Sequence, residues 1–398
     1  MKRILCALIC MLLLAGCSVT PAPTQAPSTI AVMATVPATS APETLPAETT
    51  LPIPVETMPP TTQPADPITQ ILAEMTLEEK VGQLFLARCP DIGALEDVQN
   101  YHLGGYILFG RDIEGQTPDS LRQTIAAYQE SAAIPMLIAV DEEGGTVVRI
   151  SDNYAFRQES FPSPRSLYAE GGLYRLLSME KEKCELLHSV GINVNLAPVC
   201  DVTTNPDAFM YDRSLGSDPV ETGKCIYAMV KTMKKGKIGS VLKHFPGYGN
   251  NTDTHVAAAL DSRTLTELQE CDLIPFQYGI DAECGAIMVS HTIIAAMDES
   301  LPASLSPEVN RVLRENMGFD GVVITDDLAM EAITDTYGNG ECAVLAILAG
   351  NDLLCSTYYA EQYGAVLDAA ETGRISLEVL DAAVSRVLRW KQSLGLFD

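Results

Sequence analysis

One loop of the sequence concentrates groups that can carry protons. Residues 243–255, KHFPGYGNNTDTH, contain two of the chain's five histidines, His244 and His255, together with Lys243 and Asp253. Asp253 and His255 are two positions apart, so the carboxylate can orient the imidazole if the loop turns between them. An imidazole held in this way has a pKa close to neutrality and can both donate and accept a proton. The loop therefore has the residues needed for general acid/base catalysis.

Further ionisable residues stand where short apolar runs of the sequence end. They are Asp141, Asp201, Lys243–His244, His291 and Asp326–Asp327. Capping of a following helix explains any single aspartate in such a place. Capping does not explain ionisable groups at the ends of five runs, so we expect these side chains to share a site.

The strand-like and helix-like segments that must position these residues alternate regularly along the sequence. Eight apolar, β-rich runs alternate with amphipathic, helix-like stretches over roughly 330 residues. This order predicts an α/β fold, a (β/α)8 TIM-type barrel with a single catalytic domain, whose strands end at one mouth. An open doubly wound sheet is the alternative, but no G-x-G-x-x-G follows the first run. The runs are VGQLFLA, GGYILFG, PMLIAVD, INVNLAPV, GSVLKHF, GAIMVSH, GVVITDD and AGNDLLC.

The residue set suits acid/base chemistry on a neutral polar substrate such as a sugar. The sequence has no serine in a nucleophile elbow, no metal-ligand spacing and no phosphate loop, so no metal and no cofactor is implied. Glycoside hydrolysis needs one group to protonate the leaving oxygen and another to attack or stabilise the anomeric carbon. His255 fits the first role and Asp326 the second.

The charge and the cysteine content of the chain indicate which classes of partner and which cysteine chemistry to expect. A formal net charge of −26, from 52 acidic and 26 basic residues, argues against nucleic acid or an anionic membrane surface. Eight cysteines follow residue 67, none in a C-x-x-C pair, and most lie in apolar runs. Buried thiols are therefore expected, rather than a disulfide framework or a zinc site. We expect a monomer.

The N-terminal segment indicates export. Residues 1–17, MKRILCALICMLLLAGC, have a basic start, an apolar run and a small-residue exit, as in a secretory signal peptide; a retained membrane anchor is the alternative. LAGC resembles the lipobox of bacterial lipoproteins, whose cysteine, here Cys17, is acylated. Residues 18–67 hold 12 of the 24 prolines and predict a disordered tether. We therefore expect an extracytoplasmic protein, lipid-anchored to the bacterial cell membrane, with its barrel domain at 68–398.

Six ordered motifs resemble glycoside hydrolase family 3, in its β-N-acetylglucosaminidase branch. KHFPGYGNNTDTH is similar to the branch's loop K-H-F-P-G-H-G…D-S/T-H. The other five motifs are MTLEEKVGQLF (75–85), DEEGGTVVR (141–149), NLAPVCDV (195–202), YDRSLGSDP (211–219) and GVVITDDLAM (321–330). The resemblance covers the barrel, and we expect no counterpart of the second domain that many members carry.

The resemblance implies a retaining, exo-acting β-N-acetylhexosaminidase that removes terminal β-linked N-acetylglucosamine from cell-wall-type or other glycans. Asp326 would be the nucleophile that forms a covalent glycosyl-enzyme, and His255 the acid/base with Asp253 as its partner. Five residues would bind the sugar in the terminal subsite: Asp141, Arg149, Arg213, Lys243 and His244.

Some points stay open at the level of sequence. Tyr248 stands where the branch usually has a second histidine, which leaves substrate preference unsettled. One alternative function is a β-N-acetylglucosaminide phosphorylase, because a histidine acid/base does not repel a phosphate acceptor as a carboxylate would. The others are another β-glycosidase of the family and a non-catalytic glycan-binding surface lipoprotein. Asp327 is expected to support the site or cap a helix, and His291 either to line the mouth or to be a hydrogen-bonded strand-end residue.

Overall fold

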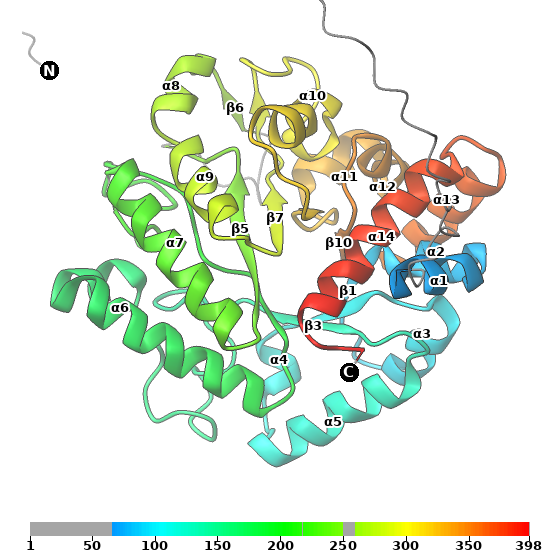
Figure 1. The fold of residues 1–398 in the computed structure, drawn as a ribbon, viewed down its shortest axis with the longest axis horizontal. Helices are drawn as coiled ribbons and strands as arrows, with labels where there is room; N and C mark the ends of the chain where they lie inside the picture. The colour runs from blue at the N-terminus through cyan, green and yellow to red at the C-terminus, as the bar shows by residue number, and fades with distance from the viewer. Residues whose placement is uncertain (1–65, 217, 250–258, 398) are drawn as a thin grey trace, which may run out of the picture. The chain divides into compact units, whose positions relative to one another are not determined.

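Eight parallel strands form a nearly closed barrel. The computed structural model describes residues 66–216, 218–249 and 259–397, which belong to one compact unit. The strand order is β10-β1-β2-β3-β4-β5-β7-β9, and β9 approaches β10 where Thr325 N donates to Leu353 O at 3.1 Å. Helices surround the strands (Figure 1), so the predicted (β/α)8 barrel is confirmed. The barrel strands are β1 (Phe85–Arg88), β2 (Gly105–Leu108), β3 (Leu137–Val140), β4 (Val194–Asn195), β5 (Gly239–Phe245), β7 (Ala286–Val289), β9 (Val322–Thr325) and β10 (Leu354–Ser356).

The strands are apolar on both faces because both faces are covered. In β3, Leu137 and Ala139 pack with the residues that fill the barrel interior, while Ile138 and Val140 pack outward with the helices. Successive side chains of a strand point to opposite faces, which produces this division. Parallel strands covered on both sides appear in sequence as continuous apolar runs. A small second sheet pairs β6 (Leu260–Asp261) with β8 (Ile293–Ile294).

Most of the helices begin at a side chain that accepts a backbone N–H. Thr117, Asp218 and Ser376 cap α5, α7 and α14 in this way. The α-helices are α1 (Pro67–Glu74), α2 (Leu77–Gln83), α3 (Ala94–Tyr101), α4 (Gly110–Ile113), α5 (Pro118–Ser131), α6 (Pro164–Ser189), α7 (Pro219–Lys235), α8 (Leu265–Glu270), α9 (Leu273–Asp281), α10 (Pro307–Arg311), α11 (Glu331–Tyr337), α12 (Asn339–Leu348), α13 (Tyr359–Glu371) and α14 (Leu377–Ser393).

The first predicted strand run was placed too early. Its residues Val81–Gln83 belong to α2, and β1 begins at Phe85. A capping box starts that helix, because Thr76 accepts from Glu79 N at 3.2 Å and Glu79 accepts from Thr76 N at 2.8 Å. The helix that this capping box starts therefore continues into the apolar run VGQLFLA, which by itself resembles a strand.

Helix α14 packs against the N-terminal end of the barrel and lies in front of the strands in Figure 1. Its Trp390 reaches the starts of two strands: a Cβ added to Gly285 would lie 2.0 Å from Trp390 Nε1, and one added to Gly239 would lie 2.9 Å from Cζ2. Only glycine fits beneath the indole at these positions. The Trp390 ring thus packs against the strand starts at this end of the barrel. A ligand-binding site is therefore expected at the opposite end.

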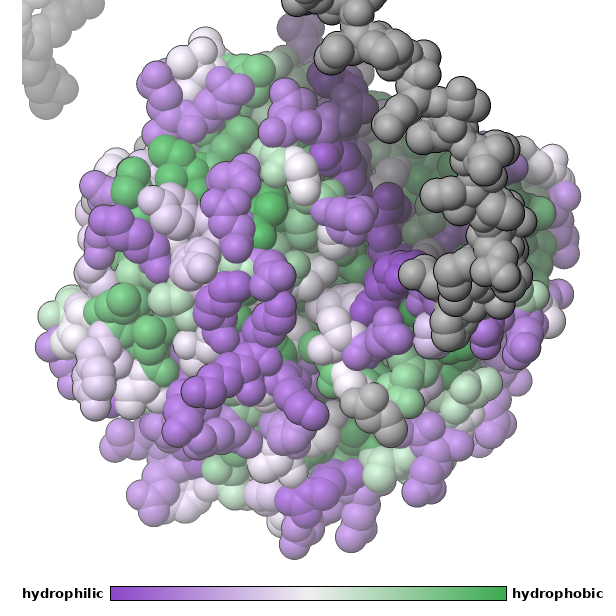
Figure 2. Space-filling view, viewed as in Figure 1, coloured by the Kyte–Doolittle hydropathy of each residue, from purple (hydrophilic) through white to green (hydrophobic). Residues whose placement is uncertain are grey.

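The surface, the cysteines and the helix lengths complete the description of the fold. Hydrophobic residues appear as separate patches between hydrophilic ones on the face drawn in Figure 2. The eight described cysteines are free thiols, seven of them buried, as the sequence predicted. No helix among the described residues is long and apolar enough to cross a membrane.

Candidate active site

The predicted site residues meet in one cavity at the C-terminal ends of the strands. It has a volume of about 650 Å³. Six of the residues that the sequence singled out for the nucleophile and the sugar subsite line it: Asp141, Arg149, Arg213, Lys243, His244 and Asp326. These residues come from the ends of three strands, β3, β5 and β9, and from the loops after β3 and β4. Convergence of side chains from several strands at this end of a barrel is typical of catalytic sites.

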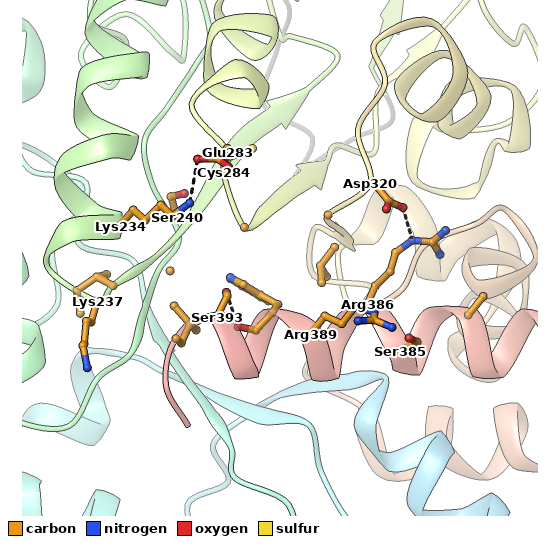
Figure 3. Close-up of a pocket in the computed structure, with 18 residues that line it drawn as sticks. Lys234, Lys237, Ser240, Glu283, Cys284, Asp320, Ser385, Arg386, Arg389 and Ser393 are labelled. Atoms are coloured by element: carbon orange, nitrogen blue, oxygen red, sulfur yellow. Dashed lines mark hydrogen bonds and ion pairs between the residues drawn. The ribbon is translucent and has the colours of Figure 1, made fainter. Parts of the chain in front are cut away.

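A second cavity, of about 500 Å³, lies at the opposite end, beside α14 (Figure 3). Its basic side chains are largely neutralised: Lys234 pairs with Glu283 at 2.9 Å, and Arg386 with Asp320 at 3.4 Å. None of the predicted site residues that the structure describes lines this second cavity. The cavity at the C-terminal strand ends is therefore the candidate active site.

Lys243 is held between two carboxylates. Its ammonium lies 2.6 Å from Asp141 Oδ1 and 2.6 Å from Glu143 Oε1. Burial alone would lower the pKa of Lys243, but Asp141 and Glu143 raise it, so the ammonium is charged. Lys243 and His244, joined by a cis peptide bond, both line the cavity.

Arg213 forms the second cationic contact of this cluster. Its guanidinium grips Glu143 through two bonds, Nε to Oε2 at 2.9 Å and Nη2 to Oε1 at 2.7 Å. Burial would raise the pKa of Glu143, but Lys243 and Arg213 hold it well below its usual range. The cluster of Asp141, Glu143, Lys243 and Arg213 thus carries two negative and two positive charges. A balanced cluster of this kind presents hydrogen-bonding groups to a neutral polyhydroxylated ligand.

His244 is oriented by Asp201. Its Nδ1 lies 2.8 Å from Asp201 Oδ2, and the same carboxylate accepts the backbone N–H of His244 at 3.1 Å and of Tyr248 at 2.7 Å. Since a carboxylate accepts, Nδ1 carries the proton, and Nε2 at 3.3 Å accepts from Arg213 Nη2. Tyr248 is buried and packs edge-on against the His244 ring at 5.2 Å, so its position supports the imidazole.

Arg149 lies near the carboxylate oxygen of Asp141 that Lys243 does not contact. Its Nη2 is 3.9 Å from Asp141 Oδ2, and its guanidinium lies 5.8 Å from the centre of the Phe109 ring. The backbone around it is fixed by buried Glu142, which accepts from Arg149 N at 2.8 Å and from Ile150 N at 2.7 Å. The adjacent acids Glu142 and Glu143 therefore have different roles, because Glu142 binds the loop backbone and Glu143 binds Lys243 and Arg213.

Asp326 and Asp327 follow β9 but have different surroundings. Asp326 lines the cavity, and its Oδ1 accepts from Asp327 N at 2.9 Å. The Asp327 carboxylate accepts from Thr357 Oγ1 at 2.5 Å and from Ala329 N at 3.0 Å. Asp327 thus supports neighbouring loops, as expected, while Asp326 is placed for contact with a ligand.

His291 is buried among its partners. It is 2.7 Å from Ser304 Oγ through Nδ1 and 3.0 Å from Asp327 O through Nε2. Of the two possibilities left by the sequence, the hydrogen-bonded strand-end histidine is the one observed. Asp253 and His255, the predicted acid/base pair, and the predicted lipidation residue Cys17 lie outside the described residues.

Three residues that line the cavity or bind the residues that line it were missed or left without a role. Glu143 is one of two adjacent glutamates in DEEGG and was not singled out from the sequence. Asp201 was noted only as an acid at the end of an apolar run. Arg88, at the end of β1, packs its guanidinium over Phe109 at 4.5 Å. Its signal in the sequence was a basic residue directly after the apolar run FLA.

Comparisons with known proteins show which proteins the chain is similar to. Residues 76–390 match the family model described as "Glycosyl hydrolase family 3 N terminal domain". "Beta-hexosaminidase LpqI" of Mycobacterium tuberculosis is 31% identical over 333 residues, covering 81% of this chain and 84% of that protein. "Beta-hexosaminidase A" of Pseudoalteromonas piscicida is 30% identical, covering 77% of this chain and 55% of that protein. The solved family 3 β-N-acetylglucosaminidase of Paenibacillus sp. FPU-7 superposes with a TM-score of 0.76 at 34% identity, over 81% of this chain and 64% of that one.

Proposed function

Because the chain belongs to glycosyl hydrolase family 3 and is a glycosidase, we propose that it is a retaining, exo-acting β-N-acetylhexosaminidase. Its substrates would be glycans of cell-wall type or others that end in β-linked N-acetylglucosamine. The names of the relatives at 30–34% identity support this substrate class.

One observation carries the proposal: three members of the charge-balanced cluster, Asp141, Lys243 and Arg213, line the same cavity as the half-buried carboxylate of Asp326. The cavity of about 650 Å³ falls within the 300–1,000 Å³ typical of small-molecule sites. Asp141 can accept from two sugar hydroxyls, while Lys243 and Arg213 can donate to others. The rigid ion pairs hold these groups in place before the ligand binds, which reduces the entropy that binding costs.

The mechanism follows from these assignments. Asp326 attacks the anomeric carbon while the imidazolium of His255 protonates the departing oxygen, so the C–O bond to the leaving group breaks as the bond to Asp326 forms. His255, now neutral, takes a proton from water, which attacks the glycosyl-enzyme and releases Asp326 and the sugar. Two displacements at the same carbon give a product of retained configuration. Asp253 orients the imidazole through both steps.

A panel of aryl glycosides tests the proposal. The N-acetyl-β-glucosaminide should be cleaved with a much higher kcat/KM than the glucoside or the xyloside, and NMR of the first product should show the β-anomer. Preferred cleavage of the glucoside would replace the proposal with another β-glycosidase of the family. Release of sugar 1-phosphate in phosphate buffer, faster than hydrolysis, would instead identify a phosphorylase. Binding of chitin-type oligosaccharides without turnover would indicate a glycan-binding protein.

We further propose that the enzyme works outside the cytoplasm, held at the membrane by acylated Cys17 and a tether over residues 18–67. The LAGC sequence and the proline-rich composition support this location. Cys17→Ala should move the protein from the membrane to the soluble fraction while its specific activity is retained. An unmodified protein found entirely in the soluble fraction would refute the anchor.

A further inference from the structure

A buried ion pair on α6 contacts the loop that follows β3. Lys183 and Glu180 lie three residues apart on the helix, 3.1 Å from Nζ to Oε2, and their side chains are 4% and 2% exposed. Lys183 Nζ also donates to the backbone carbonyl of Glu143 at 3.1 Å. Helix α6 is described throughout, and none of its residues lines the active-site cavity. Lys183 can therefore affect a ligand only through other residues.

The contact with Lys183 fixes the backbone of Glu143. The N–H of Glu143 donates to Val147 O at 3.0 Å, within the same loop. The carbonyl of Glu143 accepts from Lys183, which ties the loop to α6. Because Glu143 is 2% exposed, its carbonyl would be left buried without this donor if the Lys183 ammonium were removed.

The side chain of Glu143 extends this link to the sugar-binding donors. Its Oε1 lies 2.6 Å from Lys243 Nζ and 2.7 Å from Arg213 Nη2, and both of these residues line the cavity. A shift of the Glu143 backbone would therefore shift two cations together. A misplacement of about 1 Å in an active site can cost on the order of 10²-fold in rate.

The ion pair on α6 is not well suited to stabilising the fold by itself. The second carboxylate oxygen of Glu180, Oε1, is buried and has no hydrogen-bond partner among the described residues. Burial of an ion pair removes two charges from water, and apolar residues of similar volume are often equally stabilising or more so. The hydrogen bond that Lys183 gives to the active-site loop accounts for a buried lysine better than stability does.

We propose that Lys183 is a positioning residue of the active site, which through Glu143 sets the position of the two cations that donate to the sugar. This inference rests on the proposed hydrolase function, which assigns those cations to the sugar but gives no role to α6. The effect falls on KM, because Lys243 and Arg213 contact sugar hydroxyls in the ground state as well as in the transition state.

The double variant Glu180→Leu/Lys183→Met tests the proposal. It removes both charges and keeps side chains of similar volume, so its denaturation midpoint should equal or exceed that of the unmodified protein. KM for an aryl N-acetyl-β-glucosaminide and Ki for N-acetylglucosamine should both rise about 10- to 100-fold, as for a lost hydrogen bond to a charged group, with little change in kcat.

Glu180→Gln is the converse variant. It removes the ion pair but leaves Lys183 able to donate to the carbonyl of Glu143, so the denaturation midpoint should fall while KM and Ki stay near those of the unmodified enzyme. The matched control is Glu185→Leu/Lys181→Met, which makes the same changes in an exposed pair of the same helix, 3.4 Å apart. The control should alter neither the midpoint nor KM appreciably.

Each other outcome overturns a distinct statement. An unchanged KM in a stable double variant would overturn the inference and leave the hydrolase function intact. Unfolding of the double variant would also overturn it, because the pair would then be needed for the fold. So would an equal rise of KM in Glu180→Gln or in the exposed control, since the effect would not come from the Lys183 hydrogen bond. Failure of the unmodified enzyme to cleave the substrate would refute the proposed function itself and this inference with it.

Discussion

Lys243, which lines the active-site cavity, forms an ion pair of 2.6 Å with Glu143, and the two side chains are 3% and 1% exposed. Removing one member of a buried pair is costly because the remaining charge stays buried without its counter-ion. Here Glu143 serves two cations at once, since Arg213 also binds it. Glu143 therefore determines the position of both groups that we expect to donate to sugar hydroxyls.

Glu143→Gln should destabilise the fold and weaken substrate binding together. The amide keeps the shape but loses the charge, and we expect a loss of about 3–5 kcal/mol in unfolding free energy. KM for the N-acetylglucosaminide should rise. Denaturant unfolding and steady-state kinetics measure the two effects. Glu182→Gln, which removes an exposed partner of Arg157, is the control and should cost less than about 1 kcal/mol. A Glu143 variant as stable as this control would contradict the proposed role.

Asp326→Asn should lower kcat by a factor on the order of 10³ to 10⁶ with the fold intact, because an amide cannot form the glycosyl-enzyme. Mass spectrometry after incubation with a fluorinated slow substrate should find the sugar on Asp326. Asp327→Asn is the comparison: its carboxylate bonds Thr357 and Ala329, so its loss should affect stability more than chemistry. Label on Asp327, or an active Asp326→Asn, would show that the wrong aspartate has been assigned.

His255→Ala should discriminate between leaving groups. An acidic phenol leaves without a proton, so its release should slow little, whereas a disaccharide needs the proton and should lose about 10²- to 10⁴-fold in kcat/KM. Azide should restore turnover by attacking the glycosyl-enzyme, and the product should be the β-glycosyl azide. Asp253→Ala should act in the same direction but more weakly, because the imidazole remains. Equal losses on both substrates without azide product would assign the proton to another group, with His244 the next candidate.

Lys391, on α14, should make stability depend on pH. Burial lowers the pKa of Lys391 to about 7, and its side-chain nitrogen donates a hydrogen bond to Gln83 Oε1 at 2.6 Å. Because the pKa is lower in the folded than in the unfolded protein, the unfolded state binds the extra proton between about pH 7 and 10. The unfolding free energy should therefore rise with pH across this window, by a few kcal/mol.

Lys391→Met isolates this effect from other titrating groups. The variant loses the hydrogen bond to Gln83 at every pH, which shifts its stability by a constant amount. The difference in unfolding free energy between the unmodified protein and Lys391→Met should change with pH between about 7 and 10, in favour of the unmodified protein at high pH. A difference that stays constant across this range would show that Lys391 is charged in the folded state.

The sequence by itself determined the fold class and most of the candidate site. Eight apolar runs separated by amphipathic stretches predicted a barrel, because a parallel strand covered on both faces must be apolar throughout. Polar residues at the run ends, such as Asp141 and Asp326, then had to meet at one mouth. These inferences need only the local pattern and the topology that it implies.

Only the tertiary structure decided which partners these residues have. Glu143 meets Arg213 across 70 positions, and Asp201 meets His244 across 43. Local sequence cannot separate adjacent acids such as Glu142 and Glu143, because only the folded backbone brings Glu142 to the loop amides and Glu143 to Lys243 and Arg213. The unsatisfied Nε of Arg88 is likewise a property of its surroundings after folding. The pattern of apolar runs in the sequence places a residue at a strand end. Packing between strands that are distant in the sequence decides what its side chain contacts.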